Sequence, residues 1–127
     1  MALQCGMDLH GKNVLCSLTD EKDKVVAERR VATKLDEVLL FLGPYKSDIK
    51  GVAIESTYNW YWLVDGLLDK GYCVHLANPN AVKTYDGLKH GDDKGDARHL
   101  AHLLRLGLLP TGFIYPKEQR GMRDLLR

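Results

Sequence analysis

The feature that most constrains this chain is a run of three strand-like segments joined by short polar turns. Residues 3–9, 14–18 and 25–31 are apolar or alternating, and residues 10–13 and 19–23 between them are turn-like. Parallel neighbours need a crossover of a dozen or more residues, so segments this close together have to pair as an antiparallel meander. The first part of the chain is therefore expected to form a three-stranded antiparallel meander.

After residue 32 the pattern changes to alternating helices and strands. The segments expected are a helix over 35–42 with Thr33 as its N-cap and Gly43-Pro44 as its stop, a buried strand over 51–55, a helix over 60–70, a strand over 72–76, a short helical segment over 80–85 and a last helix over 93–106. A meander followed by βαβ units is the element order of the ribonuclease H-like fold. The sequence thus predicts an α/β fold with a five-stranded mixed sheet and helices on both faces.

Composition limits the class of protein. At 127 residues, 45% hydrophobic and 28% charged, the chain is of normal globular composition and one-domain size. Its longest uncharged apolar stretch is far too short for a membrane span, and the N-terminus lacks the features of a secretory signal. Three cysteines without a CxxC spacing exclude a disulfide scaffold and a cysteine-only zinc site. We therefore expect a cytoplasmic protein with no membrane partner.

Four acidic residues stand at positions where acidic residues are costly. Asp8 and Glu55 end the first and fourth strands, and Asp93 and Asp96 share one face of the last helix. In the predicted sheet those two strands are parallel neighbours, so both acids emerge at the same edge. Clustered carboxylates repel one another and need a cation, and oxygen donors suit Mg²⁺ or Mn²⁺. Two such ions can support phosphoryl transfer. The alternative is that each acid is an ordinary turn, strand-end or N-cap residue.

Three motifs carry a resemblance to a known family. They are GMDLH at residues 6–10, VAIEST at 52–57 and KHGDDKGDA at 89–97. Together they resemble the N-terminal domain of the DEDD-type insertion-sequence transposases, a family that also contains the pilin-gene DNA invertases. The resemblance covers nearly the whole chain, and the order Asp, Glu, Asp-x-x-Asp is its most specific part.

The resemblance implies a RuvC-like domain, similar to Holliday-junction resolvases, that cleaves and transfers DNA strands. It gives the catalytic and metal-binding positions to Asp8, Glu55, Asp93 and Asp96, with DNA as the partner and, in some members, a structured non-coding RNA. Family members are longer, so residues 1–115 are expected to be the catalytic domain. Residues 116–127 would begin a helix leading to a C-terminal domain. The 127-residue chain alone would have little activity.

Other residues are candidates for contacts with partners. Lys89, Lys94, Arg98 and Arg105 lie in a mildly basic C-terminal third and are expected to follow a DNA backbone, although a solvated helix face is the alternative. His99 and His102 are expected on the same helix side. An apolar face at Met122, Leu125 and Leu126 needs a partner, which favours a homo-oligomer.

The aromatic residues after the fourth strand and the histidine after the first need separate treatment. Trp60 is expected in the core, whereas Tyr61 and Trp62 are candidates for a partner surface. His10 is either a contact to phosphate or metal-bound water, or a solvated turn residue. Two rival functions remain open: a stand-alone endonuclease specific for branched DNA, and a non-catalytic ribonuclease H-like assembly module.

Overall fold

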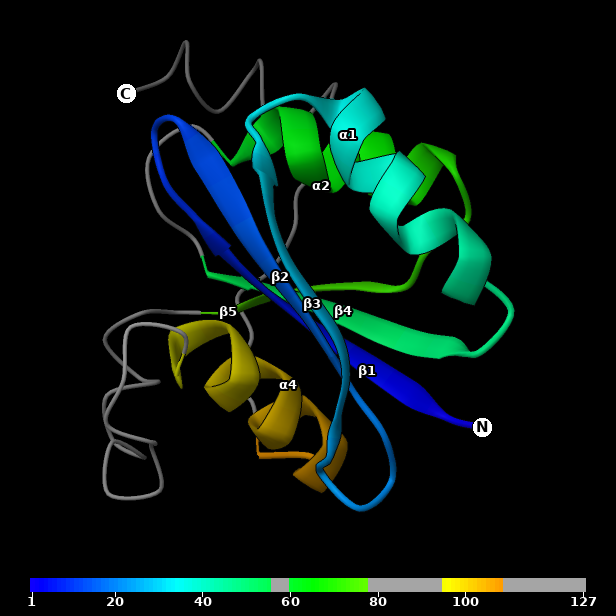
Figure 1. The fold of residues 1–127 in the computed structure, drawn as a ribbon. Helices are drawn as coiled ribbons and strands as arrows, with labels where there is room; N and C mark the ends of the chain where they lie inside the picture. Colours follow the sequence, from blue (N-terminus) through cyan, green and yellow to red (C-terminus); the bar gives the residue numbers. More distant parts are fainter. Residues whose placement is uncertain (56–59, 78–94, 109–127) are drawn as a thin grey trace, which may run out of the picture.

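A five-stranded mixed sheet with helices on both faces forms the domain (Figure 1). The computed structural model describes residues 1–55, 60–77 and 95–108, and of residues 95 and 96 only the backbone. The strands are β1 (Leu3–Leu9), β2 (Asn13–Thr19), β3 (Val25–Ala32), β4 (Ile49–Glu55) and β5 (Val74–Ala77). The helices are α1 (Leu35–Leu42), the short 3₁₀ helix η1 (Gly43–Tyr45), α2 (Tyr61–Asp69) and α4 (Gly95–Leu106). The predicted fold class is confirmed.

The order of strands across the sheet is β3-β2-β1-β4-β5. β1 pairs with β2, and β2 with β3, in the antiparallel sense, which is the predicted meander. β4 runs parallel to both β1 and β5. Cys5 of β1 lies opposite Val52 of β4, and Met7 lies opposite Ile54. The first and fourth strands are thus parallel neighbours, as the sequence predicted.

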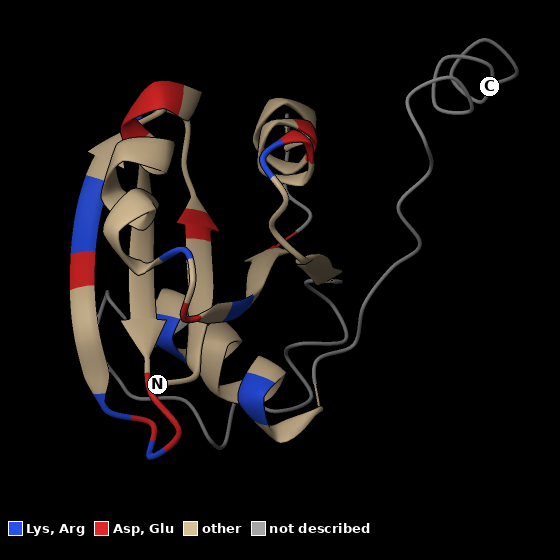
Figure 2. Ribbon diagram, turned by 90° about the vertical axis from the view of Figure 1, so that its right-hand side faces the viewer, with Lys and Arg blue, Asp and Glu red and all other residues tan. Residues whose placement is uncertain are grey.

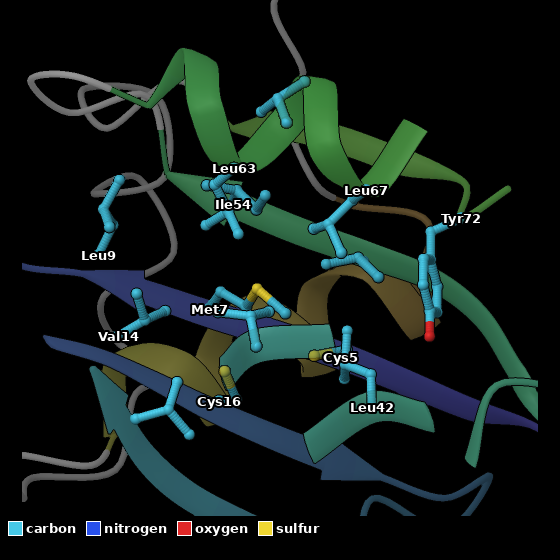
Figure 3. Close-up of a cluster of buried hydrophobic side chains, with 14 of the residues drawn as sticks. Cys5, Met7, Leu9, Val14, Cys16, Leu42, Ile54, Leu63, Leu67 and Tyr72 are labelled. Atoms are coloured by element: carbon cyan, nitrogen blue, oxygen red, sulfur yellow. The ribbon is translucent and has the colours of Figure 1, made fainter. Parts of the chain in front are cut away.

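The face of the sheet under α1 and α2 holds the main hydrophobic core. Alternate residues of β1, namely Cys5, Met7 and Leu9, point to this face because successive side chains of a strand alternate. They pack against both helices and against the neighbouring strands (Figure 3). The other buried members of this cluster are Leu3, Val14, Cys16, Leu18, Val31, Val38, Leu42, Val52, Ile54, Leu63, Val64, Leu67, Tyr72 and Leu76.

The opposite face of the sheet is covered by α4 alone among the described helices (Figure 1). Here the contact is between small residues. A Cβ atom placed on Gly6 would collide with the backbone oxygen of Ala97 and lie 2.8 Å from the nitrogen of Ala101. Ala53 and Ala77 pack with Leu100 and Leu103 in a second, smaller cluster. The missing side chain at Gly6 is therefore what lets α4 lie directly on β1.

The direction of α4 follows from these contacts. Gly51, near the start of β4, faces Leu104 near the end of the helix. Gly6, in register with Ala53 further along β4, faces Ala97 at the beginning of the helix. α4 therefore runs antiparallel to β1 and β4, and its N-terminal end lies toward the carboxyl ends of these strands.

Two local expectations are wrong and one is confirmed. Thr33 does not cap α1: its hydroxyl donates to the carbonyl oxygen of Gly11 at 3.3 Å, and the N-cap position is Lys34, which makes no side-chain cap. The predicted stop of α1 is confirmed: the helix ends at Leu42 with Gly43 as its C-cap, and the chain continues as η1 because Pro is tolerated in the first turn of a helix. The fifth strand begins at Val74 rather than residue 72, because Tyr72 follows a left-handed Gly71 (φ 86°) and turns its ring into the core.

Some expected elements lie outside the described residues. These are the short helical segment over 80–85, the loop before the last helix and the final amphipathic segment with Met122, Leu125 and Leu126. The expected domain limit at 115 lies there too. Among the helices that the structure describes, none has the length and apolar character of a membrane span.

Candidate active site

Asp8 is a carboxylate buried at the end of β1. It alternates with Met7 and Leu9, so it lies on the same face of the sheet as Gly6, the face that α4 covers. Its side chain is only 9% exposed, and its Oδ2 lies 3.0 Å from Nε2 of His10, which is 53% exposed. Burying a carboxylate is costly unless it is paired, and His10 is the partner that the structure gives to Asp8.

Glu55 ends β4 beside Asp8. Met7 and Ile54 are the last pair in the register between β1 and β4, and Asp8 and Glu55 are the residues that follow them. Adjacent parallel strands lie about 4.8 Å apart, and residues at one level point to the same face. Glu55 is partly buried and has an interaction partner. The structure thus brings the first two of the four predicted acids together.

The other two predicted acids belong to the segment around the start of α4. Asp96 is the second residue of this helix, whose N-terminal end lies toward Asp8 and Glu55. The side chain of Asp96 and all of Asp93 lie outside the described residues. In the part of the chain that the structure describes, no group of three or more His, Cys, Asp and Glu side chains is arranged to hold a metal ion.

Ion pairs fix α4 to the hairpin of β2 and β3. The guanidinium of Arg98 donates to both carboxylate oxygens of Glu28, from Nε at 2.7 Å and Nη2 at 2.9 Å. The hydroxyl of Ser17 donates to the same carboxylate at 2.9 Å. Further along, Nδ1 of His102 lies 2.9 Å from Oδ2 of Asp23. We call these contacts the hairpin clasp.

Arg105 also belongs to the hairpin clasp, since its Nε lies 3.8 Å from Oδ1 of Asp23. Two of the four basic residues assigned to DNA are therefore paired with carboxylates of this chain, Arg98 with Glu28 and Arg105 with Asp23. Lys89 and Lys94 lie outside the described residues. Sequence reasoning missed Glu28 and Asp23 because nothing in their spacing points to a helix some 70 residues later.

His99 does not share the side of α4 that carries Arg98 and His102. Its side chain is buried, with 4% of the residue exposed. It therefore belongs to the packing surface of the helix, and the expectation that it lies on a solvated or DNA-facing side is wrong.

The aromatic residues at the start of α2 are mostly part of the core. Trp60 and Trp62 are partly buried and pack against the main cluster, as predicted for Trp60. The rings of Trp60 and Tyr61 stack with their centroids 4.1 Å apart. Only Tyr61 is exposed, at 39%, so it is the one member of this group that is accessible to a partner.

The buried cysteines take no part in the site. Burial raises the pKa of the Cys16 thiol to about 12, and burial also raises the pKa of Cys5 well above its ordinary value. Such thiols are chemically inert because the reactive species is the thiolate. Cys5 and Cys16 belong to the core under α1 and α2.

A solved RuvC structure agrees with this architecture. T. thermophilus RuvC in complex with a Holliday junction substrate matches with a TM-score of 0.61 and 14% identity, over 88% of this chain and 100% of that chain. A weaker structural match, with a TM-score of 0.47 and 14% identity, is a ROK family transcriptional regulator homologous to E. coli MLC, over 68% of this chain and 30% of that chain. A search of curated proteins finds no match.

The family comparison covers the sheet, both helical layers and the candidate site. The matching family model is that of the IS110-type DEDD transposases, described as "Transposase", and it spans residues 5–127. The RuvC match shows that the fold is the ribonuclease H-like fold. This chain therefore belongs to the DEDD transposase family and contains its RuvC-like domain.

Proposed function

We propose that this chain is the metal-dependent catalytic domain of a DNA transposase, in which Asp8, Glu55, Asp93 and Asp96 hold two divalent cations for DNA strand cleavage and transfer. The observation that carries the proposal is the placement of Asp8. It is a buried carboxylate at the carboxyl edge of the sheet, next in register to Glu55. A structural domain has no need of two adjacent acids at this position, since they repel each other.

The donors present suit Mg²⁺, with Mn²⁺ as a substitute. Asp8 and Glu55 supply carboxylate oxygens, which these hard cations prefer. The described residues contain no group of three or more donors arranged for a metal, so further ligands have to come from elsewhere in the chain. Asp93 and Asp96 fit, because α4 brings its N-terminal end toward this edge. The resemblance to the DEDD transposases implies the same four positions, and the family match spans all of them.

Each residue has a role that its structural position supports. Asp8 and Glu55 are held by hydrogen-bonded strands, so the spacing of their carboxylates is set by the sheet rather than by a loop. His10 contacts Oδ2 of Asp8 from the exposed side and limits how that carboxylate can rotate. A bound pair of ions would neutralise charge on the phosphate and activate the attacking hydroxyl. The scissile phosphate would be held where the strands end.

Thermal unfolding in the presence of Mn²⁺ tests the metal site. Binding to the folded chain alone raises its stability, by about 2.7 kcal/mol at a hundred times the dissociation constant. We expect Mn²⁺ to raise the Tm of the wild-type chain and to have a much smaller effect on Asp8→Asn and Glu55→Gln. Asp36→Asn is the matched control, because this exposed carboxylate lies at the start of α1 on the other face. An unchanged Tm for the wild type at millimolar Mn²⁺ would overturn the metal site.

An assay of DNA cleavage tests the reaction itself. We expect slow, Mn²⁺-dependent nicking of supercoiled DNA that Glu55→Gln abolishes. The similar structure holds a Holliday junction, so a four-way junction is the second substrate to compare. Preferential cleavage of the junction over linear duplex would favour a structure-specific endonuclease over a transposase domain. If neither metal binding nor cleavage is observed, a non-catalytic assembly module is the function that remains.

The assembly of the active transposase is the last part of this proposal. A homo-oligomer is part of the proposal because the apolar face at Met122, Leu125 and Leu126 needs a partner to bury it. A structured RNA partner is proposed on the family resemblance alone. Sedimentation of the chain alone, with DNA and with RNA measures both the oligomeric state and the binding of RNA.

A further inference from the structure

Arg30 of β3 lies in the same row of the sheet as the candidate active site. Arg30 is opposite Leu15 of β2, and Leu15 is opposite Asp8 of β1. Directly opposite residues of paired strands point to the same face. Arg30, Leu15 and Asp8 therefore form a transverse row on the α4 face, and Glu55 continues it on β4. Two strand spacings, roughly 10 Å, separate Arg30 from Asp8.

The charge of Arg30 is available, in contrast to the arginines of the hairpin clasp. Arg30 is exposed, and its Nη1 donates to the neutral Oδ1 of Asn13 at 2.9 Å. Among the described residues no carboxylate forms an ion pair with it. Glu28, two residues earlier on the same face, is taken up by Arg98. Along β3 the acidic Glu28 is followed by the basic Arg29 and Arg30, and Figure 2 shows a red band next to a blue band on an outer strand of the sheet.

The turn between β1 and β2 adds a second cation at the same end of the sheet. Lys12 is exposed and lies between His10, the partner of Asp8, and Asn13, the partner of Arg30. The turn is closed by a hydrogen bond from the amide of His10 to the carbonyl of Asn13, 2.9 Å long. The hydroxyl of Thr33 also donates to the backbone carbonyl oxygen of Gly11 in this turn. Lys12 is thus carried by an anchored turn directly after the strand that bears Asp8.

We infer that Arg30, Asn13 and Lys12 form a phosphate-binding edge that holds the backbone of a DNA strand beside the active site. The inference rests on the proposed function for what happens at Asp8 and Glu55, but the binding itself requires no metal. A duplex carries one phosphate per about 3.4 Å of axis on each strand, so a site about 10 Å from Asp8 lies within a few nucleotides of it. The edge would therefore hold phosphates a few nucleotides from the scissile one. Contacts of this kind position a strand and read no sequence.

The test compares two neighbouring arginines. Arg29 is also exposed, but it lies opposite Cys16, which points to the α1 and α2 face. Arg29→Gln and Arg30→Gln therefore remove the same charge from opposite faces of one strand. Binding of a labelled DNA duplex is measured by anisotropy against salt concentration, in EDTA. We expect Arg30→Gln to weaken binding about tenfold at 50 mM salt and to lower the salt slope by about one, because one phosphate contact is lost.

The other variants complete the test. Lys12→Gln should weaken DNA binding, as Arg30→Gln does. Arg30→Lys should keep most of the salt slope, and Arg29→Gln should bind DNA like the wild type. Equal losses in Arg29→Gln and Arg30→Gln, or no loss in Arg30→Gln, would overturn the phosphate-binding edge. The Tm shift with Mn²⁺ should be unchanged in Arg30→Gln. A failure of the metal site would appear in that shift alone, so the two proposals fail separately.

Discussion

The two faces of the sheet are held by different kinds of interaction. Under α1 and α2 the contact is apolar, with large side chains such as Met7, Ile54, Leu63 and Leu67 fully buried (Figure 3). Under α4 it consists of small residues, a few leucines and the hairpin clasp. Each fully buried large side chain contributes roughly 1.5–3 kcal/mol, whereas partly exposed ion pairs contribute about 1 kcal/mol or less. The face that carries the candidate site is therefore the less strongly stabilised one.

This difference has a functional meaning. The strands that carry Asp8 and Glu55 are shared by both faces, so the main core fixes them whatever α4 does. The position of α4, which contains Asp96, depends instead on its close backbone contact with β1 and on the ion pairs of the hairpin clasp. The two proposed ligands on the strands are thus fixed by the main core, whereas Asp96 begins a helix that a bound cation could help to fix.

The largest effect is expected on the apolar face. Leu67 of α2 is fully buried in the main core, and Leu67→Ala should lower the free energy of unfolding by about 3 kcal/mol through lost transfer energy and a cavity. Urea denaturation followed by circular dichroism measures it. A loss below about 1 kcal/mol would mean that the apolar face is not the main source of stability.

Gly6→Ala tests the contact on the other face. The added methyl group would meet the backbone of Ala97, and backbone cannot move aside as a side chain can. Overpacking of this kind costs about 1–3 kcal/mol. Hydrogen exchange should show faster exchange in α4 and little change in β2, because α4 is displaced while the main core is kept. Uniform loss of protection throughout the sheet would show that the two faces are not separable.

Much of the fold was predictable because its signals are local. The meander follows from turns too short for a crossover, and the α/β part follows from changes in hydrophobic period. Together they predicted that Asp8 and Glu55 end neighbouring strands, which the register between β1 and β4 places side by side. Their catalytic role stays a prediction.

The hairpin clasp was not predictable for a physical reason. Glu28 on β3 looks like any charged strand residue, and its partner Arg98 looks like any solvated helix residue. Only the packing of α4 across β2 brings them together. The same lack of local signal explains why the prediction for Thr33 is wrong. Threonine is a common N-cap residue, but the hydroxyl of Thr33 donates to the carbonyl oxygen of Gly11 instead.

Glu28→Gln tests the hairpin clasp itself, with a smaller effect. It keeps the shape of the side chain but removes the charge that Arg98 pairs with at 2.7 Å. We expect a loss of about 1 kcal/mol in the free energy of unfolding, since Arg98 is left partly buried without its counter-charge. The loss should shrink at high salt, where the wild-type pair is screened. Glu37→Gln on α1 is the control, and an equal loss in both variants would contradict a specific clasp.

The smallest effect is expected at the turn that presents Asp23 to α4. Hydrogen bonds from the backbone amides of Lys24 and Lys22 to Oδ1 of Asp20, both 2.9 Å long, lower the pKa of the Asp20 carboxyl below its ordinary value. A carboxyl with a lowered pKa in the folded state stabilises that state above the unfolded pKa of about 4, and this contribution is lost as the pH falls through the folded pKa. Wild-type stability should therefore decline more between pH 5 and pH 3 than that of Asp20→Asn, whose amide does not titrate. Urea denaturation at each pH measures the difference, and parallel declines would show that the Asp20 carboxylate does not order this turn.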